Sequence, residues 1–239
     1  MQQISYLIKF VLICTLISIH LTYAQSVQDG NLNACKFLNL KTINKPIDDS
    51  IKQIIVVTYI SGSKAKVYPC QKVNQKWDNT ENVEFNALIG KNGLAKIGKK
   101  YEGDLKTPAG FYPIGDLFGY HHFKTNMKYR LITNNDKFID DPNSREYNSW
   151  VSGDTDAETY EDMLLRNNTY ELGAVINYNM APTIPYKGSA IFLHIWKNPT
   201  YPTVGCVAMS KNNLYTLLKW LNYNDKPHIL IIKNTDLLK

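Results

Sequence analysis

Short apolar runs, separated by glycine, proline, asparagine or aspartate, dominate the chain from residue 53 onwards. They are rich in Ile, Val, Tyr and Phe, which favour extended strands. The pattern predicts strands at 53–60, 64–68, 83–90, 110–115, 128–133, 172–178, 189–196 and 228–233. Such short strands, with turn residues between them, are typical of a β-sandwich or barrel rather than of alternating βαβ units.

Two segments carry helical signals instead. Residues 157–167 follow Asp154 and Asp156, which are suitable helix caps, and have acids in the first turn. Residues 211–222 follow Ser210 as N-cap and repeat leucine at the i, i+3, i+4 and i+7 spacing of one helix face. We therefore expect one mainly β domain with a few helices, one of which packs its leucine stripe on the sheet.

Residues 1–24 have the pattern of a secretory signal peptide. Lys9 precedes the apolar run FVLICTLISI, and the small residues Thr22 and Ala24 precede a plausible cleavage point. An uncleaved membrane anchor is the alternative. Both interpretations predict export, to the periplasm or cell envelope. Residues 25–50 are polar and irregular, so we expect an N-terminal extension there and the main domain at 51–239.

Composition and charge narrow the class of protein. With 239 residues, 44% hydrophobic and 20% charged, the chain is globular rather than disordered. The net charge of +6 is modest and is not concentrated in basic blocks. Proteins that bind nucleic acid usually show a basic stripe, so we expect no nucleic-acid partner.

The cysteine count distinguishes cysteines that could form a disulfide from one that could be a free, reactive thiol. Of four cysteines, Cys14 lies in the predicted signal peptide, which leaves three for the exported protein. Thiols tend to pair in oxidising compartments. Cys35 with Cys70 is the natural pair, although sequence does not prove a pairing, and Cys206 would then be free.

Cys206 lies in the segment PTVGCVAMS, just before the helix that Ser210 caps. Gly205 allows a sharp turn and a close approach of the backbone to a ligand. Backbone N–H groups at such a turn can hold an oxyanion. His194, near the end of the apolar run SAIFLHIW, is the best candidate base for a thiol nucleophile. A buried structural cysteine and a core histidine are the alternative from these residues alone.

Four segments in order resemble the L,D-transpeptidase (YkuD) family of bacterial cell-wall enzymes. In chain order they are GKNGLAKIGKKYEGDLKTPAGFYPIGDLFG, then DDPNSREYNSW, then VINYN, and last GSAIFLHIW with PTVGCVAMS. DDPNSREYNSW and VINYN are similar to the branch of the family whose motif reads G-C-V-A. The likeness runs from about Ile54 to Ile232 and implies a YkuD-like β-sandwich with a single catalytic domain at 51–239.

The resemblance implies a role for each site residue. Cys206 would be the nucleophile that forms a thioester with a peptidoglycan stem peptide, and His194 would be the general base. Thr203 would help to orient the imidazole, as would the backbone carbonyl of Ile195. Gly205 and its neighbours Val204 and Cys206 would hold the oxyanion through their N–H groups. No metal or organic cofactor is implied.

Two positions depart from the family pattern. Many relatives have glycine directly after the histidine and arginine two residues after the cysteine, whereas this chain has Ile195 and Ala208. Recognition of the acyl donor therefore stays open. The acyl acceptor stays open too: a stem amine, a D-amino acid or a wall-anchored protein for a transpeptidase, or water for a carboxypeptidase or hydrolase. A catalytically inactive wall-binding module is the third interpretation.

Glu102, Asp104 and Thr107 lie in the glycine-rich stretch GKNGLAKIGKKYEGDLKTPAGFYPIGDLFG. Each is either a turn former or a polar group on the wall of a cleft.

Overall fold

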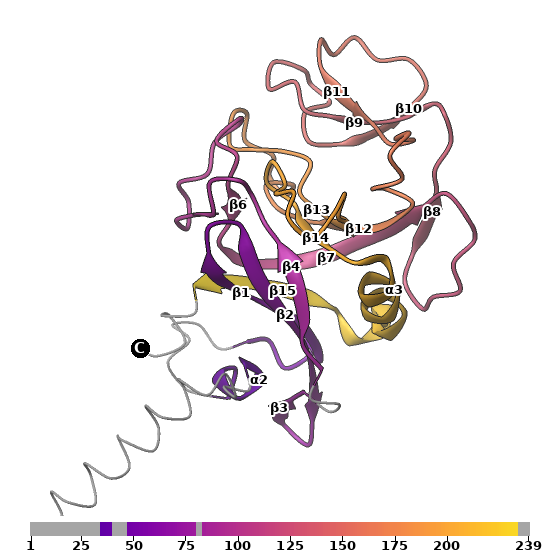
Figure 1. Cartoon of the computed structure of the whole chain (residues 1–239). Coiled ribbons are helices and arrows are strands. Elements are labelled where there is room, and N and C mark those ends of the chain that lie inside the picture. Colours follow the sequence, from indigo (N-terminus) through magenta and orange to yellow (C-terminus); the bar gives the residue numbers. More distant parts are fainter. Residues whose placement is uncertain (1–33, 40–46, 80–82, 234–239) are drawn as a thin grey trace, which may run out of the picture.

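The computed structural model describes residues 34–39, 47–79 and 83–233 (Figure 1). Over this part of the chain the fold is mainly β, with two α-helices, α2 (Ala34–Phe37) and α3 (Lys211–Trp220). The predicted signal peptide and Cys14 lie outside the described residues, as does part of the predicted extension. No helix among the described residues is long and apolar enough to cross a bilayer.

A ten-stranded sheet forms the body of the domain. Its path runs β1, β15, β7, β12, β13, β14, β4, β2 and β3, and β8 pairs with β7. Because β1 also pairs with β2, the path closes on itself. The strands are β1 (Gln53–Ser61), β2 (Lys64–Val73), β3 (Lys76–Asp78), β4 (Phe85–Leu88), β7 (Gly110–Gly119), β8 (Tyr129–Leu131), β12 (Leu172–Ile176), β13 (Phe192–Ile195), β14 (Val207–Met209) and β15 (His228–Lys233).

Each of the eight predicted strands overlaps an observed strand of this sheet, and the prediction of a mainly β, sandwich-like single domain is confirmed. The sequence missed the short pair β5 (Leu94–Ala95) and β6 (Thr107–Pro108), as well as β3 and β14. It also missed a small separate sheet in the order β10 (Trp150–Ser152), β9 (Asp136–Ile139) and β11 (Tyr160–Asp162). A 3₁₀ turn, η1, covers Tyr223–Asp225.

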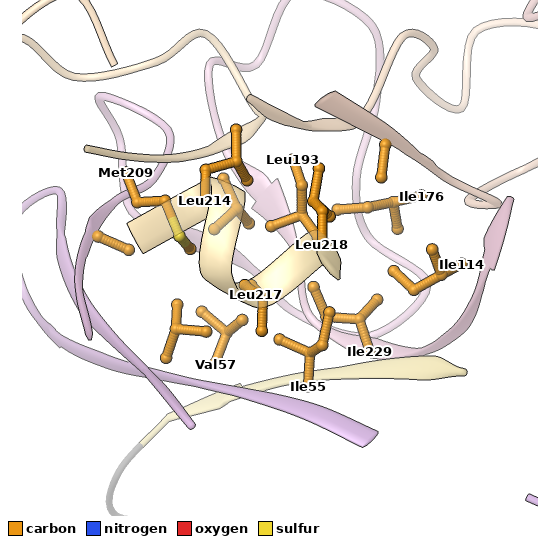
Figure 2. Packing of buried hydrophobic residues seen from close by; sticks show 14 of the residues in the cluster. Ile55, Val57, Ile114, Ile176, Leu193, Met209, Leu214, Leu217, Leu218 and Ile229 are labelled. Atoms are coloured by element: carbon orange, nitrogen blue, oxygen red, sulfur yellow. The ribbon is translucent and has the colours of Figure 1, made fainter. Parts of the chain in front are cut away.

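The main core lies inside the closed ten-stranded sheet, where the apolar side chains of its strands pack against α3 (Figure 2). Leu214, Leu217 and Leu218 of α3 are buried together with Ile55 of β1 and Leu193 of β13. Burial of each such side chain contributes about 1.5–3 kcal/mol. The predicted leucine stripe therefore joins the two sides of the sheet and places β13, which carries His194, against a rigid support.

The helix predicted at 211–222 is confirmed, because α3 begins after Ser210, whose hydroxyl accepts the N–H of Asn213 at 3.4 Å. The helix predicted at 157–167 is wrong. This segment instead supplies β11, which pairs antiparallel with β9. Its apolar residues Met163 to Leu165 are consecutive, so a helix there would have no apolar stripe to bury.

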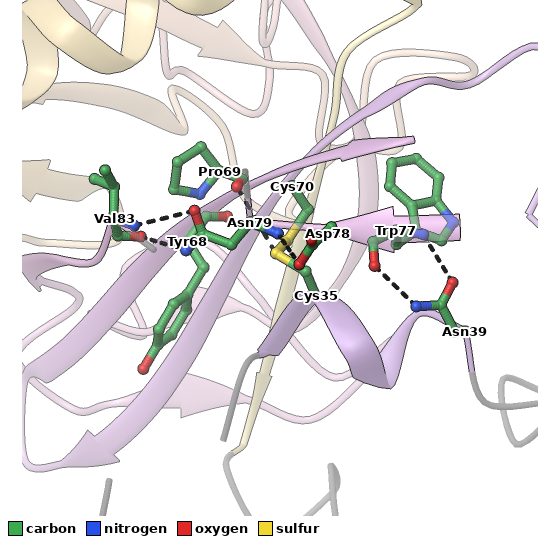
Figure 3. Close-up of a disulfide and its surroundings, with 9 residues drawn as sticks. All are labelled: Cys35, Asn39, Tyr68, Pro69, Cys70, Trp77, Asp78, Asn79 and Val83. Carbon is green, nitrogen blue, oxygen red and sulfur yellow. Dashed lines mark hydrogen bonds between the residues drawn. A yellow bond between two sulfur atoms is a disulfide. The ribbon is translucent and has the colours of Figure 1, made fainter. Parts of the chain in front are cut away.

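The second face of β1 packs against the N-terminal segment. Ile54 and Val56 point away from the main core and are buried with Cys35 and Trp77. The predicted Cys35–Cys70 disulfide is confirmed and ties α2 to β2, with the two Cα atoms 5.4 Å apart (Figure 3). Asn39 holds the same region by a pair of hydrogen bonds to the backbone N–H and carbonyl of Trp77, both 2.8 Å long.

Candidate active site

Cys206 lies directly before β14 and is buried, with only 2% of its surface exposed. Its thiol donates to the carbonyl of Ala190 at 3.2 Å and accepts the N–H of Phe192 at 3.3 Å. Burial raises the pKa of the thiol well above its usual range, and the negative charge of Glu161 acts in the same direction. The cysteine is therefore a neutral thiol at rest.

His194 lies on β13, whose neighbour β14 runs parallel and places Ala208 opposite the histidine. Its Nδ1 lies 2.8 Å from the backbone carbonyl of Ile195, so the contact expected for that carbonyl is present. Because a carbonyl only accepts hydrogen bonds, Nδ1 carries the proton. Burial lowers the pKa of His194 to about 4, so at neutral pH Nε2 is an unprotonated acceptor.

Cys206 and His194 line one cavity of about 160 Å³. His194 lies on β13, and Cys206 directly precedes the parallel neighbour β14, at the end of the loop 196–206 that joins the two strands. Tyr201 and Val204 of this loop, together with Tyr170, also line the cavity. The predicted nucleophile and the predicted base therefore face the same space.

The hydroxyl of Thr203, which was expected to help orient the imidazole, makes its hydrogen bonds to the backbone of the cysteine turn. It donates to the carbonyl of Cys206 at 2.7 Å and accepts the N–H of Gly205 at 3.2 Å. The hydroxyl of Thr107 also donates to the Cys206 carbonyl, at 3.3 Å. Two threonines from distant segments thus fix the backbone that carries the thiol.

Gly205 lies in a confined space and does not have an unusual backbone angle. A Cβ placed on it would lie 3.2 Å from Ile191 Cδ1 and 3.3 Å from the backbone oxygen of Lys106, which is tight on both sides. Its N–H already bonds to Thr203, so it does not serve as a free oxyanion donor. Of the three N–H groups at 204–206 that were expected to hold an oxyanion, that of Gly205 is therefore already hydrogen-bonded.

Two further residues near the site, Tyr170 and Glu161, were not predicted from the sequence. The ring of Tyr170 packs edge-to-face against the imidazole of His194, with centroids 5.3 Å apart. Its hydroxyl donates to the carboxylate of Glu161. Burial raises the pKa of Glu161 to about 7, a shift that the Tyr170 hydrogen bond opposes and the charge of Asp140 assists. Both residues lie in or after the segment misread as a helix, and no sequence motif marks them.

A second, smaller cavity of about 120 Å³ lies beside the first and shares Val204 with it. Glu102 lines this second cavity, so it is a cavity-wall residue. Asp104 instead forms a buried ion pair with Lys100 at 2.8 Å.

The domain is therefore a mainly β fold with a thiol and an imidazole facing one cavity, an arrangement suited to acyl transfer through a cysteine. The family model for the L,D-transpeptidase catalytic domain (YkuD) matches residues 58–230. The chain belongs to this family, whose members are cell-wall enzymes of the L,D-transpeptidase type that act on peptidoglycan peptides. No curated protein and no solved structure matches the chain.

Proposed function

We propose that the protein is an exported L,D-transpeptidase that acts on peptidoglycan stem peptides through a thioester on Cys206. The observation that carries the proposal is the shared cavity of Cys206 and His194 in a chain of this family. Export is supported by the Cys35–Cys70 disulfide, because such bonds persist in oxidising compartments. The proposal retains a signal peptide at 1–24, an extension at 25–50 and the catalytic domain at 51–239.

In the acylation step, Nε2 of His194 takes the proton from Sγ of Cys206 as the sulfur attacks a stem-peptide carbonyl. The carbonyl belongs to the L-centre that precedes the terminal D-residue. The C–N bond to that residue then breaks, and the imidazolium returns its proton to the leaving amine. The products are an acyl thioester and a free D-amino acid.

In the transfer step, an acceptor amine loses a proton to Nε2 and attacks the thioester carbonyl. The C–S bond breaks, and the sulfur recovers its proton from the imidazolium. The acceptor is a side-chain amine of another stem, a free D-amino acid or a lysine of a wall-anchored protein. The N–H groups of Val204 and Cys206 would stabilise the oxyanion in both steps.

The protonation states favour proton transfer during the attack rather than before it. The pKa of Cys206 is raised and that of His194 is lowered to about 4, both by burial. A separated thiolate–imidazolium pair is therefore disfavoured in the resting enzyme. The imidazole acts as a general base at the moment when the sulfur bonds to carbon.

Two measurements test the proposal. A carbapenem is expected to add one drug mass to the wild-type protein and none to Cys206→Ala, and equal labelling would refute the nucleophile. Purified sacculi incubated with the wild type are expected to gain new cross-links or exchanged D-residues. Trimmed tripeptides alone would identify water as the acceptor and overturn the assignment as a transferase. An unchanged sacculus would refute both.

A further inference from the structure

A buried ion pair lies beside the cysteine turn, which comprises residues 203–206. Lys100 and Asp104 are 2.8 Å apart, and their side chains are only 5% and 1% exposed. We propose that the ammonium of Lys100 is an electrostatic residue of the active site, which stabilises the negative charge that forms when the thiol of Cys206 attacks its substrate. The proposal deepens the proposed function and rests on it, because it takes Cys206 to be the nucleophile.

The ammonium approaches the cysteine turn at Gly205. A Cβ placed on Gly205 would lie 3.8 Å from Nζ of Lys100, so the positive charge is close to the backbone just before Cys206. Lys100 and Gly205 also line the same small cavity as Ala190, whose carbonyl accepts the hydrogen bond of the thiol. The charge therefore lies beside the nucleophile and is shielded from bulk solvent.

Asp104 fixes the position of the ammonium and of the segment around it. Besides Lys100, its carboxylate accepts the backbone N–H of Lys106 at 2.8 Å and that of Tyr101 at 3.2 Å. The backbone oxygen of Lys106 in turn lies against Gly205, where it would be only 3.3 Å from a Cβ. The charge is thus held on a segment that contacts the cysteine turn, and it needs no reorganisation when the reaction begins.

The ion pair uses only part of the hydrogen-bonding capacity of the ammonium. An ammonium group has three N–H donors. Within the described residues, that of Lys100 has two acceptors, the carboxylate of Asp104 at 2.8 Å and the carbonyl of Tyr101 at 3.5 Å. A buried ion pair adds little to stability by itself, because the loss of hydration offsets the attraction between the charges. Its place beside the cysteine turn therefore indicates a role in the reaction.

Two charges act on the thiol in opposite directions. The negative charge of Glu161 raises the pKa of Cys206 further than burial alone, whereas the positive charge of Lys100 lowers that pKa. When the sulfur bonds to the substrate carbonyl, its proton passes to Nε2 of His194 and negative charge moves to the carbonyl oxygen. Charges in a buried site interact strongly, because water screens them little. The ammonium therefore stabilises the transition state more than it stabilises the neutral resting thiol.

The test measures the rate at which iodoacetamide alkylates Cys206 in the full-length protein at pH 8, by mass spectrometry of the peptide that contains it. The thiolate is the reacting form, and the reagent is uncharged, so long-range attraction does not contribute. Lys100→Met should lower the rate at least about fivefold. A purely structural role predicts the opposite sign, because a loosened turn exposes the thiol and accelerates alkylation.

Lys99→Met is the matched control, because it removes an exposed positive charge from the neighbouring residue. Its rate should stay within about 1.5-fold of the wild type, since water and salt screen an exposed charge. A rate in Lys100→Met that equals or exceeds that of the wild type would overturn the proposal.

A second comparison avoids an unpaired carboxylate at Asp104. Asp104→Asn is compared with the double variant Asp104→Asn/Lys100→Met, at a temperature at which both are folded. The double variant should react at least about fivefold more slowly than Asp104→Asn, because the two differ only in the positive charge. Equal rates, or a faster double variant, would overturn the role of Lys100.

Alkylation needs no peptide, so it tests Lys100 separately from the reaction on the cell wall. Slower alkylation in both comparisons, with sacculi that the wild type leaves unchanged, would support the role of Lys100 and refute the proposed function. Unaltered alkylation in both comparisons, with sacculi that the wild type cross-links, would refute the role of Lys100 and support the proposed function.

Discussion

The surroundings of the Cys35–Cys70 disulfide and those of Cys206 are two regions that differ in how their buried polar groups are hydrogen-bonded. Around the Cys35–Cys70 disulfide the packing is apolar, and Asn39 makes two good hydrogen bonds to Trp77 (Figure 3). Around Cys206, by contrast, burial shifts the pKa of the thiol, of His194 and of Glu161. One buried carboxylate oxygen, Oδ1 of Asp140, has no hydrogen-bond partner among the residues that the structure describes.

This difference indicates what each region is built to do. A region that only stabilises the fold has no reason to bury groups in unfavourable protonation states, since each such group costs free energy. Perturbed pKa values cluster where chemistry or binding takes place. The comparison therefore separates Cys35 and Cys70, which should control stability, from Cys206, which should control turnover.

The largest effect is expected from Cys206→Ala. Loss of the nucleophile should lower turnover on sacculi by at least about 10³-fold, as for other covalent catalysts. The midpoint of thermal unfolding should change little, because alanine is smaller by only one buried sulfur atom. Turnover within tenfold of the wild type would contradict the distinction between the two regions.

Cys70→Ala should have the opposite signature. Opening the disulfide, whose cysteines are 35 residues apart, should lower the free energy of unfolding by about 2–5 kcal/mol. Turnover per folded molecule should stay unchanged, as measured well below the unfolding midpoint. Wild-type protein under reducing conditions is the control and should show the same loss. A large fall in turnover at full folding would couple the two regions.

Thr203→Val should give an intermediate effect on turnover. It removes one hydroxyl from the Cys206 carbonyl and leaves the Gly205 N–H without its acceptor. Leaving such groups unpaired costs about 1–3 kcal/mol, so kcat should fall about 5- to 150-fold. Thr200→Val is the matched control, because Thr200 lies exposed in the same loop and should have no effect. A shifted acid limb of the pH profile would show that Thr203 acts on the imidazole after all.

The smallest effect is expected from mild acid. A histidine at its usual pKa of about 6.5 would be only about 3% neutral at pH 5, so acylation would fall about 30-fold from its plateau. His194, with a pKa lowered to about 4, stays mostly neutral at pH 5, and the fall should be less than about twofold. The rate of carbapenem adduct formation measures this directly. Glu161→Gln controls for the nearby carboxyl whose pKa is about 7.

The elements predicted well are those whose pattern and environment agree. The leucines of α3 lie at helical spacing and all face the core, so local and tertiary preferences point to one structure. At 157–167 the acidic caps suggested a helix, but pairing with β9 decides the outcome. Capping signals alone were therefore misleading where no apolar stripe supported them.

The same reasoning applies to the site. His194 lies on β13 and Cys206 directly before β14, each within a recognisable motif, so the sequence could select them as candidates. Tyr170 reaches the site only because the connection before β12 runs beside β13, where the carbonyl of Thr169 accepts the N–H of Ile195, and sequence spacing does not predict that contact. The hydrogen-bond partners of Thr203, the Cys206 carbonyl and the Gly205 N–H, depend on a turn geometry that the sequence does not specify.

The disulfide also determines how tension would pass through the molecule. A pull on the chain before Cys35 is transmitted through the two sulfur atoms to Cys70, which lies on β2 inside the closed sheet. The segment between them, β1 included, is bypassed and carries none of the load. A tether at the N-terminus would therefore apply its force to the folded domain at β2. It could not separate β1 from the sheet starting at one end of that strand.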